Sequence, residues 1–507
     1  MSLINSFFNR YNSKRLKQIE YFKKNPFSVQ EATLIDLLKK AKNTEWGKRY
    51  DFGSIREVEK FKTTLPLQTY DDIKPNIDRM RNGEQNILWH SDTFWFAKSS
   101  GTSQDKSKFI PVSFEALKKC HYRGGYDVLA IYAVQNPKTK VLTSKTLTLG
   151  GSHDINNQAN KSRSGDLSAI LIQNIPRWAN LIRTPSTKIA LSSNFDDKIF
   201  RIVQNSVKEH VVAFTGVPSW NMVLMKKILE YTGKKNIHEV WPDMELFIHG
   251  GVCFDPYRQQ YEQLFPSANM HYFETYNASE GFFALQDDPK TNDMLLMLDY
   301  DVFYEFIPLE QIGKENPETK TIDQVETNKN YAIVITTNAG LWRYIIGDTV
   351  VFTSINPHKI RISGRIKQFI NVFGEEIIVD NADKALIEAC SATNAIISEY
   401  TAGPVYMDDN NNGAHEWLIE FEKEPDDLKR FTEILDRSLC TINSDYEAKR
   451  RNNSTLRLPV VHSMPKNIFY SWMKKRGKFG GQNKVPRLSN DRKYLDELLK
   501  AEVSYSI

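Results

Sequence analysis

Short strand-type runs alternate with helix-type runs through the middle of this chain. Residues 211–214 (VVAF) are continuously apolar, and the helical pattern that follows them ends at Gly233. Two more apolar runs come next, at 244–251 and 270–276. Apolar runs of this length that end in glycine or polar residues are typical of strands, and longer β-type runs from 294 to 354 predict antiparallel ribbons. The pattern therefore predicts a mixed α/β fold.

A second, smaller α+β unit is predicted after the segment 362–376. It contains a helix at about 380–391, a strand at 416–422, one long helix at 426–451 and a strand at 456–462. Two strands with two helices are enough to build a compact layered unit of their own. We therefore expect a domain boundary near residues 362–376.

Composition limits the kind of protein that this can be. The chain has 507 residues and a hydrophobic fraction of 40%, which is enough for a large core and for more than one domain. Its net charge of +5 comes from 67 basic and 62 acidic residues, so it lacks the strong basic field of a nucleic-acid-binding protein. No apolar run approaches the roughly 18 residues of a membrane span, and no signal-peptide pattern is present. We expect a soluble, cytoplasmic protein that acts on small molecules, with neither a nucleic acid nor a membrane as partner.

The cysteines do not form a metal-binding pattern. They are far apart in the sequence, without a CxxC pair or a Cys/His cluster at ligand spacing. The four are Cys120, Cys253, Cys390 and Cys440. A structural zinc site is therefore not expected.

Four segments can carry chemistry, and the first of them is rich in small hydroxylated residues. The sequence SSGTSQ begins at Ser99 and is followed by Lys106 and Lys108. Backbone N–H groups and hydroxyls around a glycine can converge on phosphate oxygens, to which a lysine adds charge. The segment does not match the GxxxxGK[ST] pattern of a P-loop. Taken alone, it is better explained as a polar turn.

The second segment, YNASEG, spans residues 276–281 and follows a predicted strand. A carboxylate such as that of Glu280 at the end of a strand can hold Mg²⁺ against phosphates, because that ion prefers oxygen ligands and needs few from the protein. A helix cap or a solvent-facing carboxylate is the alternative.

The third and fourth segments lie in the β-rich part and at the predicted boundary. In LWRYIIGD, Asp348 can accept hydrogen bonds from both ribose hydroxyls, because an ionised carboxylate has two acceptor oxygens. An ordinary hairpin turn is the alternative. GRIKQFI and GEE, within residues 364–376, could be a basic connector and nothing more.

Together and in this order, the four segments resemble the adenylate-forming superfamily of acyl-CoA synthetases, luciferases and nonribosomal-peptide adenylation domains. That superfamily has a Ser/Thr/Gly-rich phosphate loop, a YGxTE-type motif, a Y-x-x-G-D-type motif and a GRxDxxIxxxGE-type hinge. The corresponding segments here are SSGTSQ, YNASE, YIIGD and GRIKQFINVFGEE. The resemblance implies a large ATP- and acyl-binding domain over 1–364 and a small, mobile C-terminal lid domain over 365–507. The hinge would lie near Arg365–Lys367.

Further details resemble one branch, the auxin-responsive-promoter family of acyl-acid amido synthetases, in a bacterial-type form. They are the continuation into KFIP at 108–111, WPDMELFIHGG ahead of YNASEGFFAL, and NAGLWRYIIGD. Near the C-terminus, LCTINSDYEAKRR and GGQNKVPR resemble the LN-x-x-Y-x-x-x-R and Q-x-K-x-P-R segments of that family. Three positions depart from the patterns: Asp105 in the phosphate loop, Asn277 after the motif tyrosine, and Lys367 at the hinge.

The resemblance implies a role for each matched residue. Glu280 would bind Mg²⁺ and take part in catalysis, and Lys484 would be the catalytic lysine that neutralises charge during adenylation. Tyr276 would lie against adenine, and Asp348 would bind the ribose. The full set of implied ATP-binding residues is Ser99, Ser100, Gly101, Thr102, Ser103, Lys108, Gly250, Gly251, Tyr276, Ala278, Ser279, Asp348 and Arg365.

The implied function is ATP-dependent activation of a carboxylic acid as an acyl-adenylate, with release of pyrophosphate, followed by amide formation with an amino acid or other amine. The implied cofactors are ATP and Mg²⁺. A ligase that uses CoA or a carrier-protein thiol as acceptor is one alternative, and a catalytically weak nucleotide-binding protein is another. Retention of Glu280, Asp348 and Lys484 argues against the last. The sequence leaves the identities of the acid and the acceptor and the oligomeric state open.

The acyl pocket is the part that the resemblance specifies least. It would draw on the helix after the phosphate loop, around Tyr122, Arg123 and Tyr126, and on Val217 and Phe254. Arg123 could pair with the substrate carboxylate, or it could be a solvated arginine on a helix face. These five residues are not part of the predicted site.

Overall fold

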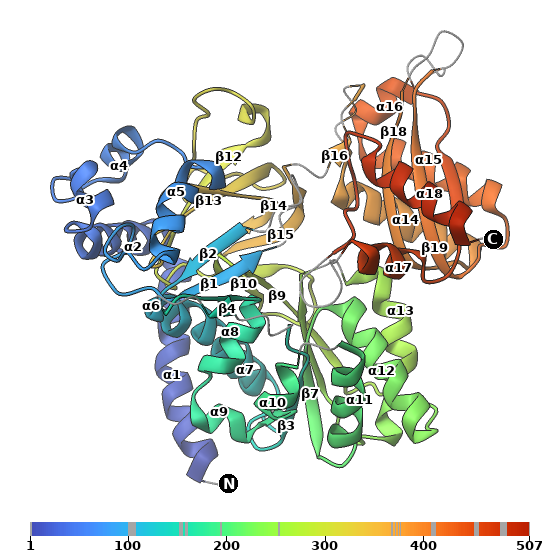
Figure 1. Cartoon of the computed structure of the whole chain (residues 1–507), viewed down its shortest axis with the longest axis horizontal. Coiled ribbons are helices and arrows are strands. Elements are labelled where there is room, and N and C mark those ends of the chain that lie inside the picture. The colour runs from blue at the N-terminus through green and yellow to red at the C-terminus, as the bar shows by residue number, and fades with distance from the viewer. Residues whose placement is uncertain are drawn as a thin grey trace. The chain divides into compact units, whose positions relative to one another are not determined.

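The computed structural model of this chain describes most of its 507 residues. They are 3–99, 108–151, 156–157, 161–192, 195–251, 254–366, 369–370, 372–373, 375, 377–406, 412–450, 456–476 and 484–505. Contacts divide the chain into two compact units (Figure 1). The large unit is Met1–Gly251, Gln263–Ile346 and Val350–Arg361, and the small unit is Val252–Glu262, Gly347–Thr349 and Ile362–Ile507. The predicted division at residues 364 and 365 stays a prediction.

The main sheet has 11 strands in the order β12-β13-β14-β15-β11-β10-β9-β8-β7-β3-β6. Its parallel part consists of β3 (Lys145–Thr148), β6 (Arg183–Thr184), β7 (Val211–Gly216), β8 (Leu246–Gly250) and β9 (His271–Ala278). The other strands are β10 (Gly281–Gln286), β11 (Met294–Leu296), β12 (Val302–Pro308), β13 (Asn330–Thr337), β14 (Tyr344–Ile355) and β15 (His358–Arg365). A separate sheet joins β1 (Trp95–Ser99), β2 (Lys108–Val112), β4 (Asn156–Asn157) and β5 (Arg163–Gly165).

Helices surround these sheets, and α11 and α12 run beside β7 (Figure 1). The helices before β1 are α1 (Leu3–Lys24), α2 (Pro26–Ala41), α3 (Glu45–Arg49), α4 (Val58–Thr64) and α5 (Tyr70–Arg81). A composite helix follows β2 and consists of α6 (Phe114–Ala116), the π-helical turn η1 (Leu117–His121) and α7 (Tyr122–Gln135). The others are α8 (Leu167–Asn174), α9 (Arg177–Leu181), α10 (Thr187–Ala190), α11 (Phe195–Ser206), α12 (Pro218–Thr232), η2 (Ile237–Glu239), α13 (Asp255–Leu264) and η3 (Leu309–Gln311).

The strands predicted in the middle of the chain are confirmed, and so is the mixed α/β class. The first four residues of β7 are all buried, as expected for a parallel strand that is covered on both faces. Phe214 of β7 stacks on Phe247 of β8, with ring centroids 4.1 Å apart. Gly233 has φ of 66° and closes α12, because glycine adopts this left-handed conformation without steric cost.

The small unit packs helices on a sheet of β18 (Ile396–Val405), β19 (Ala414–Lys423) and β20 (Val460–Met464). Its core includes Trp417, Phe421, Phe431 and Leu435. The hairpin of β16 (Phe369–Ile370) and β17 (Ile377–Ile378) precedes this sheet along the chain. The helices are α14 (Val379–Thr393), α15 (Leu428–Ile442), α16 (Ser444–Arg450), α17 (Ile468–Lys475) and α18 (Lys493–Tyr505).

The single long helix predicted over 426–451 is wrong, because the chain breaks at Asn443. That residue is extended, with φ of −129° and ψ of 110°, between α15 and α16. Its side chain accepts a hydrogen bond from Tyr446 N and donates one to Asn381. Asparagine competes for backbone hydrogen bonds and so favours caps over helix interiors.

Asp436 is the shared partner of the tyrosine and the arginine in the segment that resembles LN-x-x-Y-x-x-x-R. Its carboxylate accepts hydrogen bonds from Tyr446 Oη at 2.7 Å and from Arg450 Nε and Nη2 at 2.5 and 2.7 Å. Arg450 Nη1 also donates to the carbonyl of Leu456. The motif residues thus tie α15, α16 and the approach to β20 together, which is a structural role.

We predict that Asp436→Ala destabilises the small unit by about 3 kcal/mol, because it leaves a largely buried arginine without its charge partner. The matched control is Glu433→Ala on the same helix, an exposed position where a change of less than about 0.5 kcal/mol is expected. Calorimetric unfolding of the full chain measures both variants. Equal stability of the two would show that the Asp436 contacts contribute nothing.

Candidate functional site

The carboxyl ends of the parallel strands place several predicted residues at one edge of the main sheet. β8 ends at Gly250 and β9 at Ala278, and the two strands are parallel neighbours. Ligands of open α/β sheets bind outside the carboxyl ends of the parallel strands. The predicted glycine pair and the YNASE segment therefore lie at the edge where a ligand site is expected.

Gly250 is required by the neighbouring strand. A Cβ atom at this position would lie 2.3 Å from the carbonyl oxygen of Thr275, which is too close for any side chain. Gly251, the next residue, has φ of 88°, a conformation that also favours glycine. The family resemblance assigns both glycines to ATP binding. For Gly250 the contact with β9 is sufficient reason for a glycine, and ATP binding at this position stays a prediction.

Glu280 lies on a two-residue turn. Ala278 and Gly281 pair across β9 and β10, which leaves only Ser279 and Glu280 between the strands. So short a connection fixes the direction of both side chains. Ser279 is buried and Glu280 is half-buried. Tyr276, two residues before the turn, is buried against Phe283 with ring centroids 5.0 Å apart.

Asp348 and Arg365, two predicted nucleotide-binding residues, form an ion pair with 2.9 Å between Oδ1 and Nε. Asp348 lies inside β14 and is only 8% exposed, so the alternative of a hairpin turn is wrong. Gly347 precedes it with φ of 96°, and its carbonyl accepts a hydrogen bond from Ile366 N. The carboxylate is therefore fixed and already faces a cation.

Lys484 belongs to the small unit and interacts electrostatically with both Asp348 and Arg365. Burial is the main reason that its pKa is lowered to about 8; Arg365 and Arg487 contribute to this shift, and Asp348 opposes it. The segment that follows Lys484 is anchored, because Pro486 O accepts from Thr401 Oγ1 at 2.7 Å and Arg487 O accepts from Ala402 N at 2.8 Å. Three predicted site residues from distant parts of the sequence are thus brought together.

Arg487 is a further anchor of this segment. It forms a half-buried ion pair with Glu399, and its guanidinium lies 4.4 Å from the centroid of the Tyr400 ring. In the segment that resembles Q-x-K-x-P-R, the arginine therefore has a structural role next to the predicted catalytic lysine.

Most of the predicted phosphate loop falls outside the described residues. Ser100, Gly101, Thr102 and Ser103 lie there, together with Asp105, Lys367 and the side chain of Ser99. Ser99 and Lys108 are backbone partners at one end of the antiparallel pair of β1 and β2. The phosphate contacts of this loop stay a prediction.

The structure gives the acyl-pocket candidates other partners. Arg123 is half-buried and pairs with Asp299 at 3.0 Å, and pairing with a substrate carboxylate stays a prediction. Tyr122 Oη donates to the carbonyl of Leu171 at 2.8 Å, and Tyr126 Oη donates to Asn12 at 2.6 Å. These three side chains hold the composite helix in place.

Two groups near the strand ends escaped the sequence analysis. Lys198 is 2% exposed, and its Nζ donates to the carbonyls of Gly150 and Gly151, at 2.5 and 2.8 Å, just beyond β3. His121 Nδ1 lies 3.1 Å from Asn277 Oδ1, next to the turn that carries Glu280. A lone lysine or histidine on a helix gives no sequence signal. The only hint was Asn277, where the superfamily pattern has a small residue.

Within the described parts of the chain, no group of three or more His, Cys, Asp or Glu side chains is arranged to hold a metal ion. No described helix is both long and apolar enough to cross a membrane.

Three family models match this chain in sequence order. The GH3 family N-terminal domain matches residues 15–270, the central domain matches 295–365, and the C-terminal domain matches 380–493. The first of these alone covers just over half of the chain. The protein belongs to the GH3 family. The predicted resemblance is therefore confirmed.

Of three curated GH3 relatives, two span nearly all of this chain and one spans about two thirds of it. Putative indole-3-acetic acid-amido synthetase GH3.9 of Arabidopsis thaliana is 23% identical over 97% of this chain and 96% of its own. The 4-substituted benzoates-glutamate ligase GH3.12 of the same plant is 21% identical over 95% of this chain and 96% of its own. Indole-3-acetic acid-amido synthetase GH3.4 is 25% identical over 68% of this chain and 67% of its own.

Solved structures share the fold. The acyl acid amido synthetase AtGH3.15 in complex with 2,4-DB has a TM-score of 0.80, with 16% identity over 97% of this chain and 96% of its own. A 2-hydroxyisobutyryl-CoA ligase in the postadenylation state has a TM-score of 0.61, with 12% identity over 94% and 91%. This GH3 chain therefore has the fold of an adenylate-forming ligase.

We predict that Asp348→Ala weakens ATP binding by about 1.5–3 kcal/mol, because the ribose hydroxyls lose a charged acceptor. Asp293→Ala is the matched control, since it removes another aspartate that pairs with an arginine of β15, Arg361, at 2.6 Å. Calorimetric titration of both folded variants with ATP measures the difference. If the Asp348 variant binds ATP with unchanged affinity, Asp348 does not bind the ribose, and its role is limited to contacts within the protein such as the ion pair with Arg365.

Proposed function

We propose that this chain is an acyl acid amido synthetase. It uses ATP to convert a carboxylic acid into an acyl-adenylate and then transfers the acyl group to an amino acid or other amine. The observation that carries the proposal is the match to the N-terminal, central and C-terminal GH3 domains, with relatives of almost the same extent that are named as acid–amido synthetases or an acid–amino acid ligase. The placement of Asp348, Arg365 and Lys484 supports it.

The first half-reaction needs positioning and charge stabilisation more than covalent help. A carboxylate oxygen of the acid attacks the α-phosphorus, the bond to the β-phosphate oxygen breaks, and pyrophosphate leaves. Asp348 would hold the ribose, Tyr276 would support the adenine, and Ser279 would contact the α-phosphate. Lys484 supplies a positive charge where negative charge develops, which is the largest contribution such sites make.

Glu280 is our candidate ligand for Mg²⁺. A carboxylate on a rigid turn offers the hard oxygen that Mg²⁺ prefers, and this ion takes its remaining ligands from phosphates and water. One protein carboxylate without a larger cluster therefore fits the ion. When bound, Mg²⁺ would neutralise phosphate charge.

The second half-reaction joins the acyl group to nitrogen. The amine attacks the carbonyl carbon of the mixed anhydride, the bond to the phosphate oxygen breaks, AMP leaves, and the nitrogen releases a proton. Exclusion of water protects the adenylate in the meantime, and we propose that closure of residues 365–507 as a lid provides it. A thiol acceptor would give a thioester instead, and the fold is compatible with both.

We predict that the purified chain with ATP, MgCl₂, a panel of aryl and alkyl acids and pooled amino acids forms an amide, AMP and pyrophosphate. Mass spectrometry identifies the acid and the acceptor in one experiment. Replacement of the amino acids by CoA is the parallel assay for a thiol acceptor. ADP and phosphate as products would disprove the proposal, because transfer would then occur at the γ-phosphate.

We predict that Lys484→Ala slows adenylation by about 10²–10³ and leaves ATP binding mostly intact. Amide formation from a supplied acyl-adenylate should stay near the wild-type rate. Pyrophosphate exchange with the cognate acid and conversion of the preformed adenylate measure the two steps. A variant that is equally impaired in both would show that the lysine is structural or serves both.

The pH dependence of adenylation provides a second measurement for Lys484. A lysine is charged below its pKa and neutral above it, so kcat/KM for ATP should fall as the pH rises through about 8. Lys484→Arg is the control, because arginine keeps its charge in this range and any activity that it retains should not fall there.

A further inference from the structure

The composite helix after β2 contains a π-helical turn, Leu117–His121, between two α-helical parts. A π turn inserts one extra residue and redirects the side chains next to it, and such turns occur frequently at functional sites. Here the two redirected side chains are Cys120 and His121. Both contact the hairpin of β9 and β10.

These contacts reach both strands of the hairpin at the same level. Phe282 N of β10 donates to Cys120 Sγ at 3.1 Å, and His121 Nδ1 lies 3.1 Å from Asn277 Oδ1 of β9. Asn277 and Phe282 are directly paired across the hairpin. The π turn therefore holds the pair next to Ala278 and Gly281, the residues that close the turn carrying Ser279 and Glu280.

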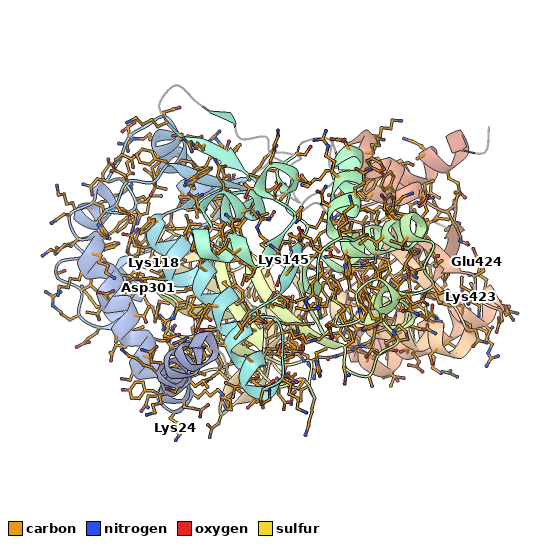
Figure 2. All side chains as sticks on the ribbon, turned by 90° about the horizontal axis from the view of Figure 1, so that it is seen from below. Lys24, Lys118, Lys145, Asp301, Lys423 and Glu424 are labelled. Carbon is orange, nitrogen blue, oxygen red and sulfur yellow. The ribbon has the colours of Figure 1, made fainter. Side chains whose placement is uncertain are left out.

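The helix and the hairpin are in direct contact. A Cβ atom at Gly124 would lie 2.4 Å from the ring of Phe282, and one at Gly281 would lie 3.4 Å from Cys120 Sγ. The helix is fixed elsewhere in the large unit as well. Lys119 pairs with Asp301, which is labelled in Figure 2, at 3.0 Å.

His121 is suited to a fixed hydrogen bond. It is 4% exposed, and burial lowers its pKa to about 4, so the ring is neutral at physiological pH. A neutral imidazole carries one N–H, and with that proton on Nδ1 it donates to Asn277 Oδ1. Asn277 is exposed, and an exposed amide would otherwise sample several orientations.

We propose that His121 and Asn277 form a positioning pair that fixes the Ser279–Glu280 turn for Mg²⁺·ATP. The pair explains why this chain has asparagine where the superfamily motif has a small residue: the side chain serves as the attachment point for the helix. The inference rests on the proposed function, because it assigns ATP to this turn.

The test compares calorimetric titrations of the full chain with ATP in MgCl₂ for His121→Leu, Asn277→Ala and the double variant. Loss of one hydrogen bond should weaken Mg²⁺·ATP binding about fivefold to tenfold in each single variant. The double variant should be no weaker than the weaker single one, since both remove the same interaction. His121→Gln, which can still donate to Asn277, should recover much of the affinity.

His358→Leu is the matched control. His358 is also buried, and its ring bonds one backbone carbonyl, that of Ile322, at 2.8 Å, but it lies outside the proposed site. This variant should lose stability and keep its affinity for ATP. Hydrogen exchange of residues 277–281 should accelerate in the His121 and Asn277 variants and stay unchanged in the control.

Two outcomes would disprove the proposed role of His121 and Asn277. A third would disprove the proposed function as well. If single variants that fold bind Mg²⁺·ATP as wild type does, or if their effects multiply in the double variant, the pair does not position the turn. If His121→Leu does not fold, Asn277→Ala alone shows whether loss of the hydrogen bond weakens Mg²⁺·ATP binding. A wild-type chain that does not bind Mg²⁺·ATP would overturn the proposed function and this inference with it.

Discussion

The edge of the large unit at which we propose the site depends on the close approach of β8 and β9 at Gly250. Gly250 pairs with Thr275, and the space for a side chain is taken by the Thr275 carbonyl. This contact sets how closely β8 and β9 approach each other. Because β9 continues into a hairpin after only three more residues, the position of Glu280 depends on a backbone contact at the neighbouring strand.

The hairpin that follows is held from two directions. β8 supports its first strand, and the π turn of the composite helix holds the pair of Asn277 and Phe282. In the proposed function this turn binds phosphate, and double support would hold it in place, because catalysis by positioning loses rate when a group moves by a fraction of an ångström. The same composite helix begins directly after β2, so the strand that follows the predicted phosphate loop and the support of the Glu280 turn are continuous in the chain.

The small unit contains several buried charges, each with a partner. Glu375 and His415 are fully buried and 2.9 Å apart, and Arg487 pairs with Glu399. Burial alone would raise the pKa of Glu375, but the hydrogen bond from His415 holds it below its usual range. Lys484 differs, because burial, Arg365 and Arg487 together lower its pKa against the opposing effect of Asp348. In the proposed function this cation would interact with phosphate, whereas the paired charges organise the unit around it.

The parts of the fold that could be predicted from the sequence are those that depend on residues close together in the chain. The strands β7, β8 and β9, the end of α12 at Gly233 and the mixed α/β class follow from apolar runs and glycine, which act within a few residues. The break between α15 and α16 was missed, because the helical pattern of apolar residues continues across Asn443. Its cap depends on Asn381, which is distant in sequence.

The proposed site also has parts that could be predicted from the sequence and parts that could not. The four motifs by themselves predicted the family, which is confirmed, and that resemblance implied the ATP chemistry and the site residues that we propose. Only the tertiary structure decided that Asp348 meets Arg365 within strands, that Arg123 belongs to Asp299, and that His121 reaches Asn277. These pairs join residues far apart in the chain, and a hydrogen bond depends on distance and direction in space, which the order of residues does not contain.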